Sequence, residues 1–140
     1  MIKKILYLAV MFFMFGCNDF AVKKHVVENY YLIATDAEEA LDLSYHESSD
    51  GNNFGTIIDA TVFAIGYNDK YIIAKQHPRT FPNPPDKKIT NYYILPLKKG
   101  MDWKSKNGLI GPLTLEQFNE KCIELNISKE VLFTNSIELL

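Results

Sequence analysis

Two neighbouring segments rich in β-branched and aromatic residues, Thr56–Tyr67 and Lys70–Gln76, constrain the fold most. The dipeptide between them, Asn68-Asp69, tolerates left-handed backbone conformations better than most residues, so it is suited to a tight turn. The sequence therefore predicts a β-hairpin. Pairing its strands directly across this turn places Ile65 opposite Ile72 and gives the hairpin one apolar face.

Three further segments have the composition of strands. Val26–Thr35 is apolar on both faces, which is typical of a central strand. Leu41–Glu47 alternates, with its leucines pointing inward and the set Asp42, Ser44 and His46 pointing toward water. Ile89–Leu97 follows a proline-rich loop and contains Pro96, which fits only an edge or a strand end. A short apolar run at Val131–Phe133 predicts another edge strand.

One segment, Thr114–Asn126, has the pattern of a helix. Thr114 and Gln117 form a capping box, and Phe118 and Cys122 recur at helical spacing on an apolar stripe. We therefore expect an α+β domain: an antiparallel β-meander of about five strands, with one C-terminal helix, Leu115 to Leu125, packed on the sheet.

The N-terminal residues are typical of a lipoprotein signal peptide. Lys3 and Lys4 precede eleven apolar residues, Ile5–Phe15, a stretch too short for a bilayer-spanning helix, which needs about 20 residues. Gly16 then precedes Cys17, the expected lipid attachment site. We predict a signal peptide over residues 1–16, a lipidated cysteine and tether over 17–25, and a single α+β domain over 26–140, facing away from the cytoplasm.

Composition narrows the classes of partner. Loss of Lys3 and Lys4 with the signal peptide changes the formal charge from −2 to −4, which makes nucleic acid an unlikely partner. Arg79 is the single arginine, so forked phosphate clamps are scarce and a nucleotide enzyme is disfavoured. Cys122 has no second cysteine to pair with once Cys17 carries lipid.

Candidate catalytic and metal-binding residues are dispersed. The histidines His25, His46 and His77 lie far apart in sequence, so we expect no metal site and no cofactor. Cys122 lies on the apolar stripe, where a thiol is usually inert. We therefore expect no enzyme activity, and the alternative is a small hydrolase assembled from His46, Asp59 and His77.

Basic residues concentrate in one block, Lys87–Lys106, which holds six lysines against one aspartate in an otherwise acidic chain. Two aromatic residues lie in or near this block. Such a surface suits anionic lipid head groups or an acidic envelope protein. A solvated loop is the more common explanation for such a block of lysines. The predicted interaction surface comprises Phe81, Lys87, Lys88, Lys98, Lys99 and Trp103.

The order of these features resembles a family of small bacterial lipoproteins of unknown function. The features are the lipid-attachment cysteine, the strand sequence Asn29-Tyr30-Tyr31-Leu32, the hairpin Gly66–Lys75, and a Gly-Pro-Leu-Thr helix start followed by Phe118. The resemblance implies the fold and the envelope location, and it brings no catalytic residues. We expect a membrane-anchored, non-enzymatic binding module. An immunity or inhibitor protein against a toxin is the alternative within the binding class.

Overall fold

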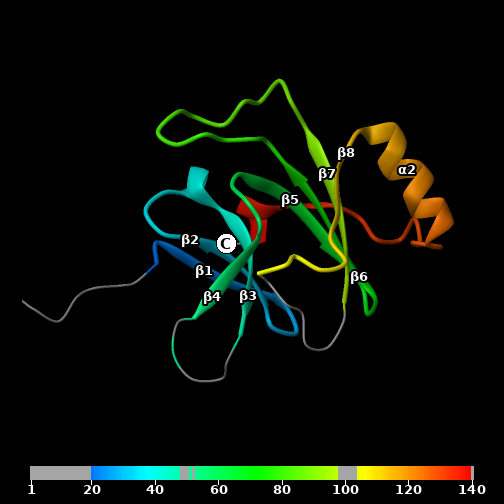
Figure 1. Cartoon of the computed structure of the whole chain (residues 1–140), viewed down its shortest axis with the longest axis horizontal. Helices are drawn as coiled ribbons and strands as arrows, with labels where there is room; N and C mark the ends of the chain where they lie inside the picture. Colours follow the sequence, from blue (N-terminus) through cyan, green and yellow to red (C-terminus); the bar gives the residue numbers. More distant parts are fainter. Residues whose placement is uncertain (1–19, 48–50, 52, 98–103, 140) are drawn as a thin grey trace, which may run out of the picture.

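The computed structural model describes residues 20–47, 51, 53–97 and 104–139. Their strands form two antiparallel sheets (Figure 1). The four-stranded sheet has the order β1 (Val22–Val27), β2 (Tyr30–Ala34), β3 (Asp42–His46), β4 (Phe54–Ile58). The five-stranded sheet has the order β8 (Ile110–Leu113), β7 (Asn91–Pro96), β6 (Tyr71–Gln76), β5 (Val62–Tyr67), β9 (Thr134–Asn135).

The two sheets share one apolar core. Alternate residues of β2 and β3, such as Leu32 and Leu43, are buried in the same cluster as Ile65, Ile72 and Leu95 of the other sheet. Because side chains of a strand alternate between faces, the remaining residues of each strand point to the outer faces. The protein therefore presents two outer faces, one for each sheet.

The outer face of the five-stranded sheet is covered by the helix α2 (Leu115–Glu124) (Figure 1). Thr114 caps the helix, since its hydroxyl accepts a hydrogen bond from the amide of Gln117 while the Gln117 side chain accepts one from the Thr114 amide. Phe118 packs with Ile73 and Ile94 of the sheet. The predicted helix, its capping box and the α+β class are confirmed. Among the described residues no helix has the length and hydrophobicity needed to cross a bilayer.

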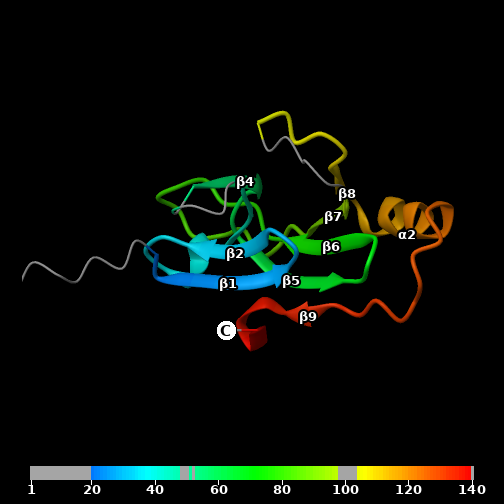
Figure 2. The same cartoon turned by 90° about the horizontal axis from the view of Figure 1, so that it is seen from below.

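The C-terminal segment returns from the helix to the edge of β5 (Figure 2). It forms the two-residue strand β9 and then the 3-10 helix η2 (Ser136–Leu139). Gly66 of β5 permits this approach, because a Cβ atom there would lie 2.5 Å from the carbonyl oxygen of Leu132. The predicted edge strand therefore exists, a few residues later than expected at Val131–Phe133.

The single central strand predicted over Val26–Thr35 is wrong. The chain forms β1, turns at Glu28 and Asn29, and returns as β2. Glu28 adopts a φ of 50°, a left-handed conformation that is uncommon for glutamate. The sequence therefore gave no indication of a turn at this position. As a further consequence, β1 begins at Val22, inside the segment 17–25 that was expected to be a tether.

The predicted long strand Thr56–Tyr67 is also divided. It forms β4 and β5, which belong to different sheets and are separated by residues 59–61. The two divided strands, β8 in a segment expected to be a loop, and the short edge strand β9 together explain why the described residues contain nine strands in two sheets rather than about five in one.

The β5–β6 hairpin is present with a register shifted by two residues. Ile65 pairs with Ala74 and Tyr67 with Ile72. The Asn68 side-chain oxygen accepts hydrogen bonds from the amides of Lys70 and Tyr71, both at 2.8 Å, which lengthens the turn. A shift of two residues leaves the side chains between Ala64 and the turn on their predicted faces. An irregularity between Val62 and Ala64 changes the register once more, and Val62 packs in the same cluster as Ile65.

Candidate functional site

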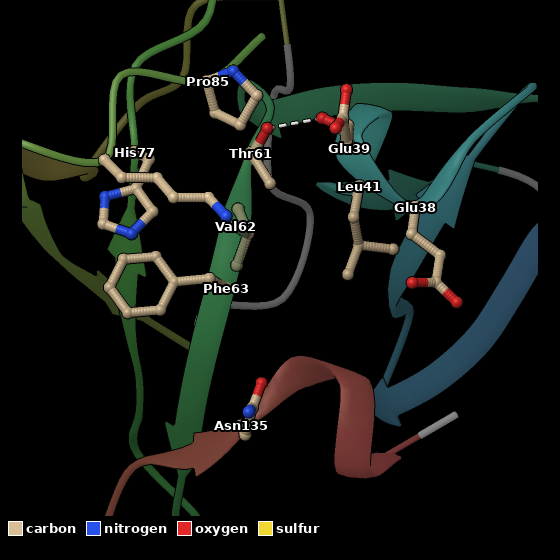
Figure 3. A pocket seen from close by; sticks show the side chains of 10 residues that line it. Glu38, Glu39, Leu41, Thr61, Val62, Phe63, His77, Pro85 and Asn135 are labelled. Atoms are coloured by element: carbon tan, nitrogen blue, oxygen red, sulfur yellow. Dashed lines mark hydrogen bonds between the residues drawn. The ribbon is translucent and has the colours of Figure 1, made fainter.

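A pocket of about 320 Å³ lies where the two sheets meet (Figure 3). Its walls come from the five-stranded sheet, from the short segment that leads into β3, and from the loop between β6 and β7. A hydrogen bond of 2.8 Å from the Val62 amide to the Leu41 carbonyl joins the sheets at this point. The pocket is lined by Glu38, Glu39, Leu41, Thr61, Val62, Phe63, His77, Pro85, Lys87 and Asn135.

Hydrogen bonds fix the backbone around the pocket. Thr61 and His77 exchange two of them: the Thr61 amide donates to the His77 carbonyl at 2.9 Å, and the His77 amide donates to the Thr61 carbonyl at 3.0 Å. The Thr61 hydroxyl donates to the carbonyl of Glu39, in the 3-10 helix η1 (Glu38–Ala40). The start of β5, the end of β6 and η1 are therefore held as one unit, and the walls of the pocket are preformed.

An aromatic pair forms one side of the pocket. The pairing of β5 with β6 is irregular between Val62 and Ala64, and this β-bulge contains Phe63. The Phe63 ring stacks on the His77 imidazole with a centroid separation of 4.0 Å and an interplanar angle of 11° (Figure 3). The bulge thus places Phe63 against a residue that follows the neighbouring strand.

The His77 ring has a defined orientation. Its Nδ1 lies 2.8 Å from the carbonyl oxygen of Ile89. A carbonyl oxygen only accepts hydrogen bonds, so Nδ1 carries a proton, and in the neutral imidazole Nε2 is the acceptor. Within the described part of the chain, Nε2 makes no hydrogen bond. It is therefore available to accept a hydrogen bond from a ligand.

Charged side chains of opposite sign flank an apolar floor. Leu41 and Val62, exposed by 2% and 0%, provide the floor. Glu38 and Glu39 belong to η1 on one side, and Lys87 belongs to the proline-rich loop on the other. An apolar cavity with a few polar groups at its margin is the usual character of a ligand site.

The predicted interaction surface is described only in part. Phe81 is 77% exposed, and Lys87 and Lys88 are exposed on the same loop. Of these residues Lys87 lines the pocket. The remaining predicted positions lie outside the described residues: Cys17, Lys98, Lys99 and Trp103.

The three residues of the hydrolase alternative have separate environments. His46 contacts the Gly51 carbonyl, Asp59 forms an ion pair with Lys106 at 3.6 Å, and His77 stacks on Phe63. No hydrogen bond or ion pair joins any two of the three. Across the described ranges there is also no group of three or more histidine, cysteine or acidic side chains suited to a metal ion.

Asp42 is a half-buried acid that the sequence pattern predicted to face water. Its carboxylate accepts hydrogen bonds from the hydroxyls of Ser44, at 2.6 Å, and Thr56, at 3.2 Å. Burial, aided by the charge of Asp59, raises the pKa of Asp42 to about 6, although these hydroxyls and Lys106 act in the opposite direction. The expectation that these two residues face solvent is wrong, since Ser44 is buried and Asp42 is half-buried.

Sequence reasoning missed the pocket as a unit. It considered His77 and Lys87 separately and gave no weight to Thr61 or Phe63. The available signal was the position of His77 directly before a proline-rich loop, since such loops lie on the surface and often carry function.

Comparison with known proteins assigns the chain to a family. No curated protein and no solved structure matches it significantly. One family profile matches residues 27–138, from the end of β1 to η2, and therefore includes every residue of the pocket. The chain belongs to the family described as protein of unknown function (DUF3997).

Proposed function

We propose that the protein is a lipoprotein of the cell envelope, anchored through Cys17, and that it acts as a non-enzymatic binding module. The anchor is supported by the sequence of residues 1–17: a basic start, a short apolar stretch and a small residue before the cysteine. The folded chain begins at Val22, a few residues after the anchor, so the domain lies close to the membrane.

The observation that carries the binding function is the pocket between the sheets. Its floor is apolar, its walls are preformed by backbone hydrogen bonds, and its margin holds Glu38 and Glu39 opposite Lys87. Such a site fits a ligand with an apolar body, an anionic group that meets Lys87 and a donor that meets Nε2 of His77. Rigid walls favour affinity because little conformational entropy is lost on binding.

The anchor is tested by Cys17→Ser, with Cys122→Ser as the matched control. The first variant should carry no lipid on its N-terminal peptide and should leave the membrane fraction, because a lipid chain at that sulfur is the proposed attachment to the bilayer. The control should fractionate as the wild type does. Undiminished lipid incorporation in Cys17→Ser contradicts the anchor.

The pocket is tested with anilinonaphthalene sulfonate, a fluorescent probe with an apolar body and one anionic group. Phe63→Ser and Lys87→Glu should each weaken its binding, because they remove the aromatic wall and the cation. The matched controls are Phe81→Ser and Lys88→Glu, which alter exposed residues of the same loop outside the pocket. Equal affinity in the pocket variants and the controls contradicts this site.

A further inference from the structure

The outer face of the four-stranded sheet carries a cluster of aromatic, histidine and lysine side chains near the start of the fold. Its members come from β1, β2, β3 and β4 and from the short segment that precedes β1. They lie opposite the core because their strand neighbours, such as Leu32 and Tyr45, pack inside it. We call this cluster the aromatic face: Phe20, Lys23, His25, Tyr31, His46 and Phe54.

Contacts link all of its members. Tyr31 is central, with ring centroids 5.1 Å from His25, 6.0 Å from His46 and 5.3 Å from Phe54. The Lys23 ammonium lies 4.9 Å from the centre of the Phe54 ring, on which Phe20 also packs at 5.5 Å. Cation–π and edge-to-face contacts of this kind fix the rings in one arrangement.

The outer faces of the two sheets differ in what covers them. The helix α2 packs on β7 and β8, so the outer face of the five-stranded sheet is covered. Lys23 and His25 of the aromatic face are exposed, and its tyrosine and phenylalanine rings are half-buried. The aromatic face is therefore only partly covered, and it presents ring edges and the exposed side chains of Lys23 and His25.

The position of the aromatic face relative to Cys17 identifies its partner. Three residue steps separate Cys17 from Phe20, and an extended chain covers about 10 Å in that length. The polar interface on each side of a bilayer is about 5 to 8 Å thick. A lipid on Cys17 therefore holds Phe20 and the rings packed on it within reach of the head groups.

We propose that the aromatic face docks on the surface of the bilayer that holds the Cys17 lipid. This inference rests on the proposed anchor. Tyrosine and other aromatic rings favour the membrane interface, where an apolar body and a polar edge are both accommodated. Lys23, which is exposed on the aromatic face, supplies positive charge for anionic head groups. Lys24 is exposed on the other face of the edge strand β1 and adds positive charge nearby. Docking uses none of the residues that line the pocket, since no lining residue belongs to the aromatic face.

The test measures which histidines the membrane protects. Lipidated mature protein is placed in vesicles of equimolar phosphatidylcholine and phosphatidylglycerol, treated with diethyl pyrocarbonate, and analysed residue by residue by mass spectrometry. The reference is the mature chain with Cys17→Ser in solution, which retains every described strand. His25 and His46 should react severalfold more slowly on the vesicles, whereas His77 in the pocket should react equally in both samples.

A pair of variants identifies the charges responsible. Lys23→Gln with Lys24→Gln should lower the ratio of docked to undocked protein by up to about 30-fold, since each lysine near an anionic surface contributes about fivefold. The matched control, Lys87→Gln with Lys88→Gln, removes equal charge from the proline-rich loop and should leave His25 protected. If the control abolishes protection and the first variant does not, the loop is the docking surface and the proposal is wrong.

The two proposals fail in distinguishable ways. A Cys17 that carries no lipid in the producing cell overturns the anchor, and with it the distance argument for docking. A lipidated chain whose His25 and His46 react at the solution rate overturns docking alone and leaves the anchor in place. Protection that persists on vesicles of phosphatidylcholine only would contradict the role assigned to the lysines.

Discussion

Replacement of the half-buried acid Asp42 by asparagine should change how stability depends on pH. The Asp42 carboxyl has a pKa of about 6 in the folded protein, against an ordinary value of 3.8 for aspartate, and burial is the main cause. Between these values the folded state holds a proton that the unfolded state has released. The contribution of Asp42 to stability is therefore largest below about pH 4 and is lost as the pH rises through about 6, because ionisation is disfavoured in the folded site.

The size of the effect follows from the shift. A difference of about two pKa units corresponds to about 3 kcal/mol of unfolding free energy, at 1.36 kcal/mol per unit. Asparagine resembles the protonated acid, and its side-chain oxygen can still accept a hydrogen bond from Ser44 or Thr56. The Asp42→Asn variant should therefore gain about 3 kcal/mol relative to wild type between about pH 4 and pH 7.

Urea unfolding at a series of pH values measures this difference directly. Subtracting the two proteins cancels the groups that titrate equally in both, histidines included, so the remaining slope belongs to Asp42. Asp69→Asn, in the exposed β5–β6 turn, is the matched control and should follow wild type at every pH. Parallel profiles for wild type and Asp42→Asn would show that the carboxyl ionises in the folded protein without cost, which refutes the reasoning.

Three further substitutions test the packing. Phe118→Ala should lower the free energy of unfolding by about 3 to 5 kcal/mol in denaturant melts, because the ring is 6% exposed and its centroid lies 5.2 Å from that of Tyr92. The control is Ile123→Ala on the same helix, where the side chain is 79% exposed and the change should be less than about 0.5 kcal/mol. Tyr30→Phe should stabilise the protein by about 1 kcal/mol, since the buried hydroxyl has no hydrogen-bond partner among the described residues; a loss of stability would reveal one. Gly66→Ala should cost about 1 to 3 kcal/mol and speed amide exchange at Asn135, because the new methyl group displaces the Leu132 backbone; unchanged exchange would contradict this close approach.

Features set by neighbouring residues could be predicted from the sequence. The helix is the clearest case, because Thr114 and Gln117 are three residues apart and make reciprocal hydrogen bonds whatever the rest of the chain does. The faces of the β5–β6 hairpin were predictable for a similar reason. Its register was not, because the turn length depends on the two hydrogen bonds that the Asn68 side chain accepts.

Features that depend on distant contacts were not predictable. Ser44 alternates with apolar residues and therefore looked exposed, but the four-stranded sheet surrounds it with larger side chains of β2 and β4. The edge strand β9 consists of Thr134 and Asn135, which have no strand pattern, and its position depends on the space above Gly66. In each case the deciding neighbour lies far away in the sequence.

The pocket has the same origin as the largest error in the predicted fold. Between Ile58 and Val62 the chain leaves one sheet and enters the other, and a continuous strand over Thr56–Tyr67 would have kept both halves in one sheet. The transition places Thr61 beside η1 and His77, and the bulge that follows presents Phe63 to the imidazole. A single flat meander has no such junction, so the pocket could not be inferred until the break was known. Substitutions in this junction, at Thr61 or Phe63, should therefore have two effects at once: they should weaken ligand binding and loosen the association of the two sheets.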